Sequence, residues 1–148
     1  MSQIFYQVVD ITKVPVIASH SSLRKFTPGF ERNMNDDMIK ALGENGGEIM
    51  INFCSSFVSK EAGQWRKGLT AARKALIAKE GEDSPKLENF EKSYREKVPY
   101  PYSTLDEVLD HIDHVVELIG IEHVGIAVED LSGISNIFSD ILGLEFAG

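Results

Sequence analysis

The chain has 148 residues, a formal net charge of −8 and 43% hydrophobic residues, which is typical of one folded domain. The negative charge argues against a nucleic-acid partner and an anionic membrane surface, and no apolar run approaches the roughly 20 residues that span a bilayer. The single cysteine, Cys54, excludes an internal disulfide and a cysteine-rich zinc site. Because the N-terminus lacks the features of a signal peptide, a cytoplasmic location is the default unless the natural chain begins upstream.

The first third of the chain alternates helix and strand patterns. Residues 2–12 carry a broad apolar face typical of a short helix, and residues 14–18 form a β-branched run that suits a buried parallel strand. Residues 35–37 can cap and charge a second helix, and residues 48–53 predict a second strand. The order helix, strand, helix, strand predicts an α/β fold with a parallel sheet.

The middle of the chain is charged and helix-prone. Residues 58–98 predict a helical hairpin inserted after the second strand, with its turn at residues 81–85 and its end at Pro99 and Pro101. Trp65 falls at helical spacing with other apolar residues of this segment. We therefore expect it to pack within the hairpin rather than to serve as a stacking platform for a ligand.

The last third begins with the clearest helix signal. Thr104 and Glu107 have the spacing of a capping box, and Gly120 can end the helix. Residues 122–128 predict a third strand, and Asp130 begins a further helix. The apolar stripe of the capped helix comprises Leu105, Val108, Leu109, Ile112, Val115, Val116 and Ile119.

His20 is the best single candidate for chemistry. It follows the first predicted strand within the polar cluster 19–22, at the end of the sheet where α/β folds place their active sites. A neutral imidazole in that position can act as a metal ligand or a general base. The alternative is a hydrogen-bonded structural histidine, and the residues alone leave both interpretations open.

Two further histidines are three residues apart on the capped helix. His111 and His114 are flanked by Asp110 and Asp113, so a metal-binding pair is conceivable. His114 falls opposite the apolar stripe and His111 falls at its edge, which favours a solvent-exposed face for both. Cys54 follows a strand with no matching base, and we expect an ordinary core or strand-end residue there.

Five segments resemble the renal or membrane dipeptidase family, in the same order and at family-like spacing, over roughly residues 1–126. The segments are residues 15–22 (PVIASHSS), 32–37 (RNMNDD), 46–53 (GGEIMINF), 110–116 (DHIDHVV) and 120–125 (GIEHVG). The resemblance implies a (β/α)8 barrel with a two-zinc site that hydrolyses dipeptides, some members taking D-residues at the C-terminal position. We therefore expect a partial TIM-barrel-like fragment with a helical hairpin insertion.

The resemblance also implies roles for two residues. His20 matches a zinc-ligating histidine, and Arg32 matches an arginine that binds the substrate carboxylate, a task that suits a planar guanidinium. Taken by itself, Arg32 fits a surface salt bridge as well. Zinc is the implied cofactor. In a two-metal site one ion polarises the carbonyl while the pair generates a hydroxide.

The chain departs from the family pattern at both ends of the implied site. The family's HxD pair, bridging glutamate and second histidine have no counterpart, so we expect a fragment with an incomplete metal site. The family continues after the fifth segment, from His-Val-Gly-Ile or a close variant, into Gly-Ser-Asp-Phe-Asp-Gly, whose first aspartate is catalytic. Glu129 falls in that position here, within an unrelated context, and we assign it no catalytic role.

A second, shorter resemblance begins at residue 121. Residues 121–131 (IEHVGIAVEDL), 136–138 (NIF) and 141–144 (ILGL) are similar to the start of a vicinal-oxygen-chelate domain, as in methylmalonyl-CoA epimerase. That family would make His123 a metal ligand, whereas the dipeptidase pattern makes it structural, which we favour. The predicted organisation is a dipeptidase-like partial barrel over residues 1–126 and the start of a second module over residues 127–148.

The sequence thus predicts part of a zinc-dependent dipeptidase-like hydrolase that is inactive in isolation. A dipeptide-like small molecule is the expected ligand if the protein is active. One alternative is a non-enzymatic α/β module that self-associates through its open sheet edges, which would make it a homo-oligomer. A second alternative is a truncated vicinal-oxygen-chelate epimerase or lyase.

Overall fold

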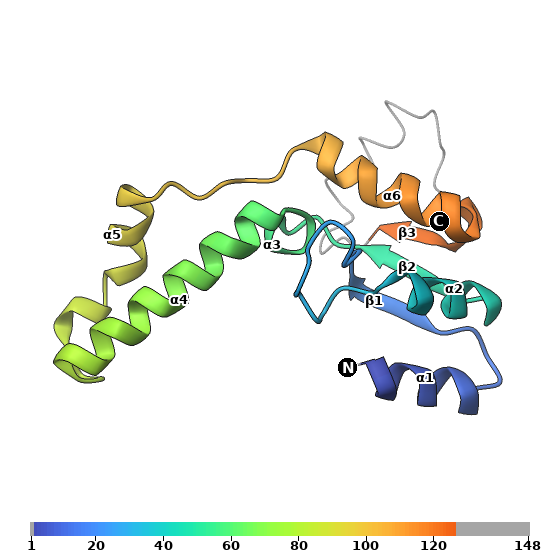
Figure 1. Ribbon diagram of the computed structural model, residues 1–148, viewed down its shortest axis with the longest axis horizontal. Coiled ribbons are helices and arrows are strands. Elements are labelled where there is room, and N and C mark those ends of the chain that lie inside the picture. The colour runs from blue at the N-terminus through green and yellow to red at the C-terminus, as the bar shows by residue number, and fades with distance from the viewer. Residues whose placement is uncertain (1, 127–148) are drawn as a thin grey trace, which may run out of the picture.

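The structure is a computed structural model that describes residues 2–126, which form a mixed α/β fold around a small parallel sheet (Figure 1). The three strands are β1 (Ile17–Ser21), β2 (Glu48–Ile51) and β3 (Val124–Ile126), in the order β1-β2-β3 with both pairs parallel. The α/β class and the parallel sheet predicted from the sequence are confirmed. The helix predicted from Asp130 lies outside the described residues.

Three helices pack beside one another at the sheet. They are α1 (Ser2–Ile11), α2 (Asp36–Glu44) and α6 (Leu105–Ile119), with α2 in contact with both others and α2 and α6 in contact with β2. The buried core between helices and strands consists of Leu23, Met34, Met38, Ile39, Leu42, Ile49, Ile51, Val58, Val108 and Val115. The helices therefore shield one face of the strands.

Helix α2 has the start that its sequence predicts. Asn35 is the N-cap, and its Oδ1 accepts a hydrogen bond from the Met38 backbone N–H at 3.0 Å, while Asp36 and Asp37 place negative charge in the first turn. Beyond the helix, Gly46 adopts a φ of +74°, which a side chain would disfavour. The chain thus turns sharply from α2 into β2.

Strand β1 lies further along the chain than predicted. The expected strand was residues 14–18, but pairing with β2 begins only at Ile17 and continues to Ser21. Pro15 has no N–H to contribute, and the Val16 N–H is bonded at 2.8 Å to the Asn45 side chain instead of to a strand. The apolar run therefore leads into the strand, and the polar residues after it form the strand's second half.

Strand β1 contains a bulge. Ala18 pairs with Ile49, but Ser21 pairs with Ile51, so three steps along β1 match two steps along β2. One extra residue lies between these pairs, and such bulges redirect side chains and are frequent next to active sites. The bulge falls on residues 19 and 20.

The predicted helical hairpin is present as an arm that extends away from the sheet (Figure 1). The short helix α3 (Ser55–Val58) leads into the long α4 (Lys60–Glu80), and the turn η1 (Pro85–Leu87) leads into α5 (Phe90–Lys97), which packs back on α4. The hairpin prediction is confirmed, including the position of its turn.

Trp65 holds the base of the arm together. Its side chain is buried and packs edge-to-face against Tyr94 and Tyr100, with ring centroids 5.3 and 4.8 Å away. The indole N–H donates a hydrogen bond of 2.8 Å to the Val98 carbonyl, and the Arg95 guanidinium lies over the indole ring. The expected packing role of Trp65 is confirmed.

Helix α6 begins with the predicted capping box. The Thr104 hydroxyl accepts from the Glu107 N–H at 3.2 Å, and the Glu107 carboxylate accepts from the Thr104 N–H at 2.7 Å. That backbone hydrogen bond from Thr104 is the main reason why the pKa of Glu107 lies below its usual range. The helix ends at Gly120, and a turn, η2 (Ile121–His123), leads into β3. No helix within residues 2–126 has the length and apolar character needed to cross a membrane.

Candidate functional site

His20 lies within β1 rather than after it, one residue before the strand ends. Its side chain is exposed, and Nδ1 lies 3.1 Å from the Ser19 Oγ. Among residues 2–126, no group forms a hydrogen bond with Nε2. The second ring nitrogen is therefore available to a ligand.

The bulge explains why His20 is exposed. In a regular strand alternate side chains share a face, so His20 would follow Ala18, which packs against the core. Because the bulge adds one residue, the buried position passes to Ser21, while Ser19 and His20 are both exposed. At the C-terminal end of β1, the His20 imidazole therefore points away from the helices.

Arg32 lies in the loop 22–34 that follows β1, and its guanidinium carbon lies 4.8 Å from the ring centroid of Phe57. Arg32 forms no salt bridge with any residue between 2 and 126, so the ion-pair alternative finds no support there. Its backbone carbonyl accepts a hydrogen bond of 3.1 Å from the Ser21 hydroxyl. Since Ser21 adjoins His20, the structure brings the backbones of both candidate residues to the same end of β1.

Asn33 is the buried centre of this loop, and the sequence analysis missed it. The side chain is fully buried; its Oδ1 accepts from the Ser22 N–H at 2.9 Å, and its amide donates to the Thr27 hydroxyl at 2.6 Å and the Phe57 carbonyl at 2.7 Å. One amide therefore joins the two ends of the loop, next to β1, and fixes the loop to α3. The signal that could have identified Asn33 is its position next to Arg32, in a segment that resembles the dipeptidase family.

The solvent-exposed face expected for His111 and His114 is wrong. The exposed fractions are 0% for His111 and 8% for His114, whereas Leu105 and Leu109, expected in the apolar stripe, are 69% and 44% exposed. The loop 22–34 covers this side of α6, and the Phe26 ring lies 4.6 Å from the His111 ring. The loop that covers α6 determines which face of this helix is buried. The periodicity of the helix sequence carries no information about that loop.

Both histidines use their ring nitrogens in structural hydrogen bonds. His111 accepts from the Leu23 N–H and donates to the Val58 carbonyl, both at 3.0 Å. His114 Nε2 lies 3.2 Å from the Asp36 carboxylate, and its Nδ1 lies 3.0 Å from Lys25 Nζ. With all four nitrogens engaged, the conceivable metal-binding pair on α6 is not formed.

The remaining candidates either have surroundings that suggest no chemistry or lie outside the described residues. His123 Nδ1 donates to the Gly47 carbonyl at 2.7 Å, which supports the structural interpretation of this residue. Cys54 is exposed just after β2, in the strand-end position that the sequence predicts. Glu129 lies outside the described residues.

The described residues offer one exposed imidazole but form no complete metal site. Within residues 2–126, no three His, Cys, Asp or Glu side chains come together in a way that could hold a metal ion. His20, exposed and with an available Nε2, fits the chemistry of one zinc ligand. Any metal site that includes His20 needs ligands from outside this set.

The sequence profile of the membrane dipeptidase family (Peptidase family M19) matches residues 1–143 of this chain. An uncharacterized dipeptidase of Schizosaccharomyces pombe is 32% identical over 129 residues, which are 87% of this chain and 22% of the relative. Dipeptidase verJ of Clonostachys rogersoniana is 34% identical over 127 residues, or 86% of this chain and 22% of the relative. The chain thus spans less than a quarter of the length of these relatives.

Solved structures share the fold at lower identity. The probable dipeptidase PvdM of Pseudomonas aeruginosa superposes with a TM-score of 0.63 and 22% identity, covering 97% of this chain and 42% of that protein. A metallopeptidase of Rhodobacter sphaeroides, liganded with a phosphinate mimic of the dipeptide L-Ala-D-Ala, gives a TM-score of 0.55 and 19% identity over 97% of this chain and 34% of that protein.

The family match bears on the two resemblances found in the sequence. It extends to residue 143, into the segment where a vicinal-oxygen-chelate module was expected. The boundary at residue 126 stays a prediction, because residues 127–148 are outside the described part. The match covers far more than half of the chain, and the chain belongs to the membrane dipeptidase family, peptidase family M19.

Proposed function

We propose that this chain forms one sector of the active site of a zinc-dependent dipeptidase. In this sector His20 is a metal ligand and Arg32 binds the carboxylate of a dipeptide. The observation that carries the proposal is the hydrogen bond of 3.1 Å from the Ser21 hydroxyl to the Arg32 carbonyl. It ties the backbone of Arg32 to the residue that follows His20, at the C-terminal end of one parallel strand, where barrel enzymes carry their chemistry.

The exposure of one face of the sheet supports the proposal that this chain is part of a larger barrel. A parallel sheet is ordinarily buried on both faces, yet Ile17, which alternates with the core-packed Ala18, is 58% exposed. On the same face, the partly exposed Met50 side chain lies directly against Gly125 of the neighbouring strand. A face that the helices leave uncovered is what a sector of a (β/α)8 barrel would present towards the barrel interior.

Arg32 is prepared to recognise a carboxylate. Stacking on Phe57 holds one face of the guanidinium, and the N–H groups at its edge can then form two parallel hydrogen bonds to a carboxylate. The Asn33 hydrogen bonds fix the adjacent backbone. A dipeptide ends in such a carboxylate, so this residue would select for a free C-terminus.

His20 is prepared to donate its Nε2 electron pair. The Ser19 hydroxyl oxygen, 3.1 Å from Nδ1, can accept a hydrogen bond from Nδ1–H, and this favours the tautomer in which Nε2 carries no proton. Zinc, when bound, would act as a Lewis acid and lower the pKa of a coordinated water. Within this chain, the task of His20 is to hold and orient one coordination position.

Imidazole NMR of the full chain tests the ligand role. Addition of zinc should shift and broaden the ring resonances of His20 first, because His111, His114 and His123 already use ring nitrogens in hydrogen bonds. These three histidines are internal controls. If one of them responds at lower zinc concentration than His20 does, the assignment of His20 is wrong.

Dipeptide hydrolysis tests the active site. The purified chain with zinc should hydrolyse L-Ala-D-Ala negligibly, because residues 2–126 hold no group of three metal ligands. When residues 1–126 replace the matching part of the Schizosaccharomyces pombe relative, zinc-dependent hydrolysis should persist if that relative shows it. It should disappear with His20→Ala, and Arg32→Lys should raise KM.

Two results would contradict this picture. Turnover by the purified chain that is lost in His20→Ala would show that the chain is active alone. A grafted enzyme that is folded and active but insensitive to His20→Ala would remove His20 from the metal site. The Arg32→Lys variant separates the second role, because loss of carboxylate recognition changes KM more than kcat.

A further inference from the structure

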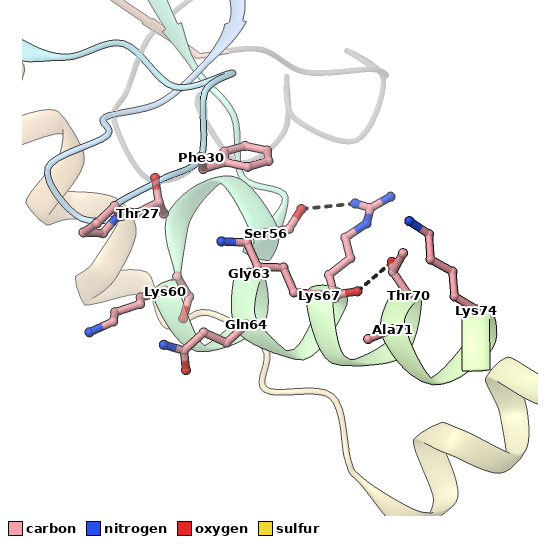
Figure 2. Close-up of a pocket in the computed structure, with 13 residues that line it drawn as sticks. Thr27, Phe30, Ser56, Lys60, Gly63, Gln64, Lys67, Thr70, Ala71 and Lys74 are labelled. Atoms are coloured by element: carbon pink, nitrogen blue, oxygen red, sulfur yellow. Dashed lines mark hydrogen bonds between the residues drawn. The ribbon is translucent and has the colours of Figure 1, made fainter. Parts of the chain in front are cut away.

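A cavity of about 520 Å³ lies outside the His20 and Arg32 region, between the loop around residues 27–30 and one side of α3 and α4 (Figure 2). Its volume falls within the range of roughly 300–1,000 Å³ that is usual for small-molecule sites. Neither His20 nor Arg32 lines it. The cavity is therefore separate from the site proposed above.

The wall formed by α4 is strongly basic. Lys60, Lys67 and Lys74 all line the cavity, and their spacing of seven residues places them on one helix face at intervals of roughly 10 Å. Arg66 also lines it and donates to the Ser56 hydroxyl at 3.3 Å. In residues 2–126 none of these four cations forms a salt bridge, although the chain carries a net charge of −8.

Small residues between the lysines leave room for a ligand. Gly63 and Ala71 line the cavity, and a Cβ placed on Gly63 would have no atom within 4 Å. Across the cavity, Lys67 Nζ would lie 3.9 Å from a Cβ at Gly29, so this ammonium reaches from α4 towards the loop. Figure 2 shows the Lys67 side chain running along the helix past Gly63.

The polar groups that line the cavity differ in whether they are free to bind a ligand. The Thr27 hydroxyl donates to the Leu23 carbonyl and accepts from the Asn33 amide, and the Thr70 hydroxyl donates to the Arg66 carbonyl. The lysine ammonium groups form no hydrogen bond within residues 2–126. Phe30 adds an apolar surface. The free donors are thus cationic and the remaining surface is apolar.

We propose that this cavity binds a small organic molecule that carries at least two oxyanion groups, carboxylate or phosphate. A single oxyanion would satisfy only one part of a basic face that extends over two seven-residue intervals, whereas two groups can contact successive lysines. Phe30, Gly63 and Ala71 would contact the body of the molecule. The limited volume of about 520 Å³ favours a small molecule over a polynucleotide, and the net charge of −8 would also repel a polynucleotide.

Two aromatic rings connect this cavity to Arg32. Phe30 packs edge-to-face on Phe57 with a centroid distance of 5.0 Å, and the Arg32 guanidinium stacks on the same Phe57. A ligand against Phe30 would therefore lie two rings away from the guanidinium. The proposal does not depend on the dipeptidase function, because binding is measured on the chain itself.

Calorimetric titration of the full chain at low salt tests the proposal, with citrate and fructose 1,6-bisphosphate as the carboxylate and phosphate probes. At least one probe should bind saturably, and acetate and inorganic phosphate should bind more weakly. Lys67→Ala should weaken binding at least about tenfold, which is the effect of losing a charge-assisted hydrogen bond. Lys79→Ala is the matched control, because Lys79 is on the same helix but not in the cavity.

A second variant tests the cavity without a change of charge. Gly63→Leu should fill the open space and abolish binding, while the thermal unfolding midpoint confirms that the variant is folded. The proposal is overturned if neither probe binds saturably, if Lys79→Ala weakens binding as much as Lys67→Ala, or if Gly63→Leu binds normally. Binding of an oligonucleotide without binding of either probe would also overturn it.

Discussion

His111 Nδ1 lies 3.0 Å from the backbone nitrogen of Leu23, which is 88 positions earlier in the chain. Because a backbone N–H can only donate, Nδ1 accepts, and the ring proton is on Nε2, which donates to the Val58 carbonyl at 3.0 Å. One neutral imidazole thus joins α6, the loop after β1 and α3. All three residues are buried or nearly so.

Removal of this imidazole should destabilise the fold. In His111→Leu the Leu23 N–H and the Val58 carbonyl would both remain buried without a partner, at a cost of about 2–4 kcal/mol in the free energy of unfolding. Urea denaturation measures the loss. His123→Ala is the comparison, because His123 is half-buried and makes one hydrogen bond, and its cost should be clearly smaller. Equal costs for the two variants would contradict the bridging role.

The same residue should make stability depend on pH. Burial lowers the pKa of His111 below its ordinary value, although the Val58 hydrogen bond and the nearby carboxylates oppose this. The unfolded chain then binds more protons than the folded chain as the pH falls below about 6.5. The free energy of unfolding should be fully retained above that pH and should decline towards pH 5.

The variant His111→Gln isolates this contribution, because glutamine keeps hydrogen-bonding capacity but does not titrate. Its unfolding free energy should fall less between pH 7 and pH 5 than that of the unaltered chain, as measured by urea denaturation at several pH values. If both proteins lose stability in parallel, the pH dependence comes from other groups.

Asn33 should not tolerate a carboxylate. Asn33→Asp keeps the shape but removes the amide donor to the Phe57 carbonyl and the Thr27 hydroxyl, and it buries a charge, so we expect a loss of about 3–5 kcal/mol. Asn35→Asp is the matched control, because aspartate is an equally good N-cap for α2, and its effect should remain within about 0.5 kcal/mol. Similar effects in both variants would show that Asn33 is not the centre of the loop.

Two glycines within α4 should respond differently to alanine. Gly63→Ala meets no atom within 4 Å and should raise the free energy of unfolding by about 0.5–1 kcal/mol, since alanine favours the helix. A Cβ at Gly68 would lie 2.8 Å from the Tyr94 hydroxyl, and Tyr94 is held against Trp65. Gly68→Ala should therefore gain less or lose stability. Thermal unfolding of both variants checks the difference, and an equal gain would contradict it.

Local signals were sufficient for the helices. The capping box at Thr104 and Glu107 and the turn between α4 and α5 depend on residues close together in the chain, so the sequence predicts them well. Trp65 could be placed within the hairpin for the same reason. Such elements are determined by neighbours a few positions away.

Non-local contacts were not predictable from the sequence. Strand β1 extends through the polar residues to Ser21 because Ser21 pairs with Ile51 of β2 beyond the bulge, and side-chain polarity does not report that pairing. His111 and His114 are buried because the loop 22–34 covers α6, whereas helical periodicity describes only the helix itself. The same loop contains Asn33, whose partners lie at the start and middle of the loop and in α3.

The buried Asn33 amide has a consequence for the carboxylate recognition that we propose for Arg32. Because its hydrogen bonds order the loop beside Arg32 in the folded protein, a carboxylate that arrives there need not immobilise the backbone. The conformational entropy of the loop is then lost during folding rather than during association. A chain organised in this way should bind its ligand with little change in backbone order, and affinity differences between ligands should reflect their contacts rather than their capacity to reshape the loop.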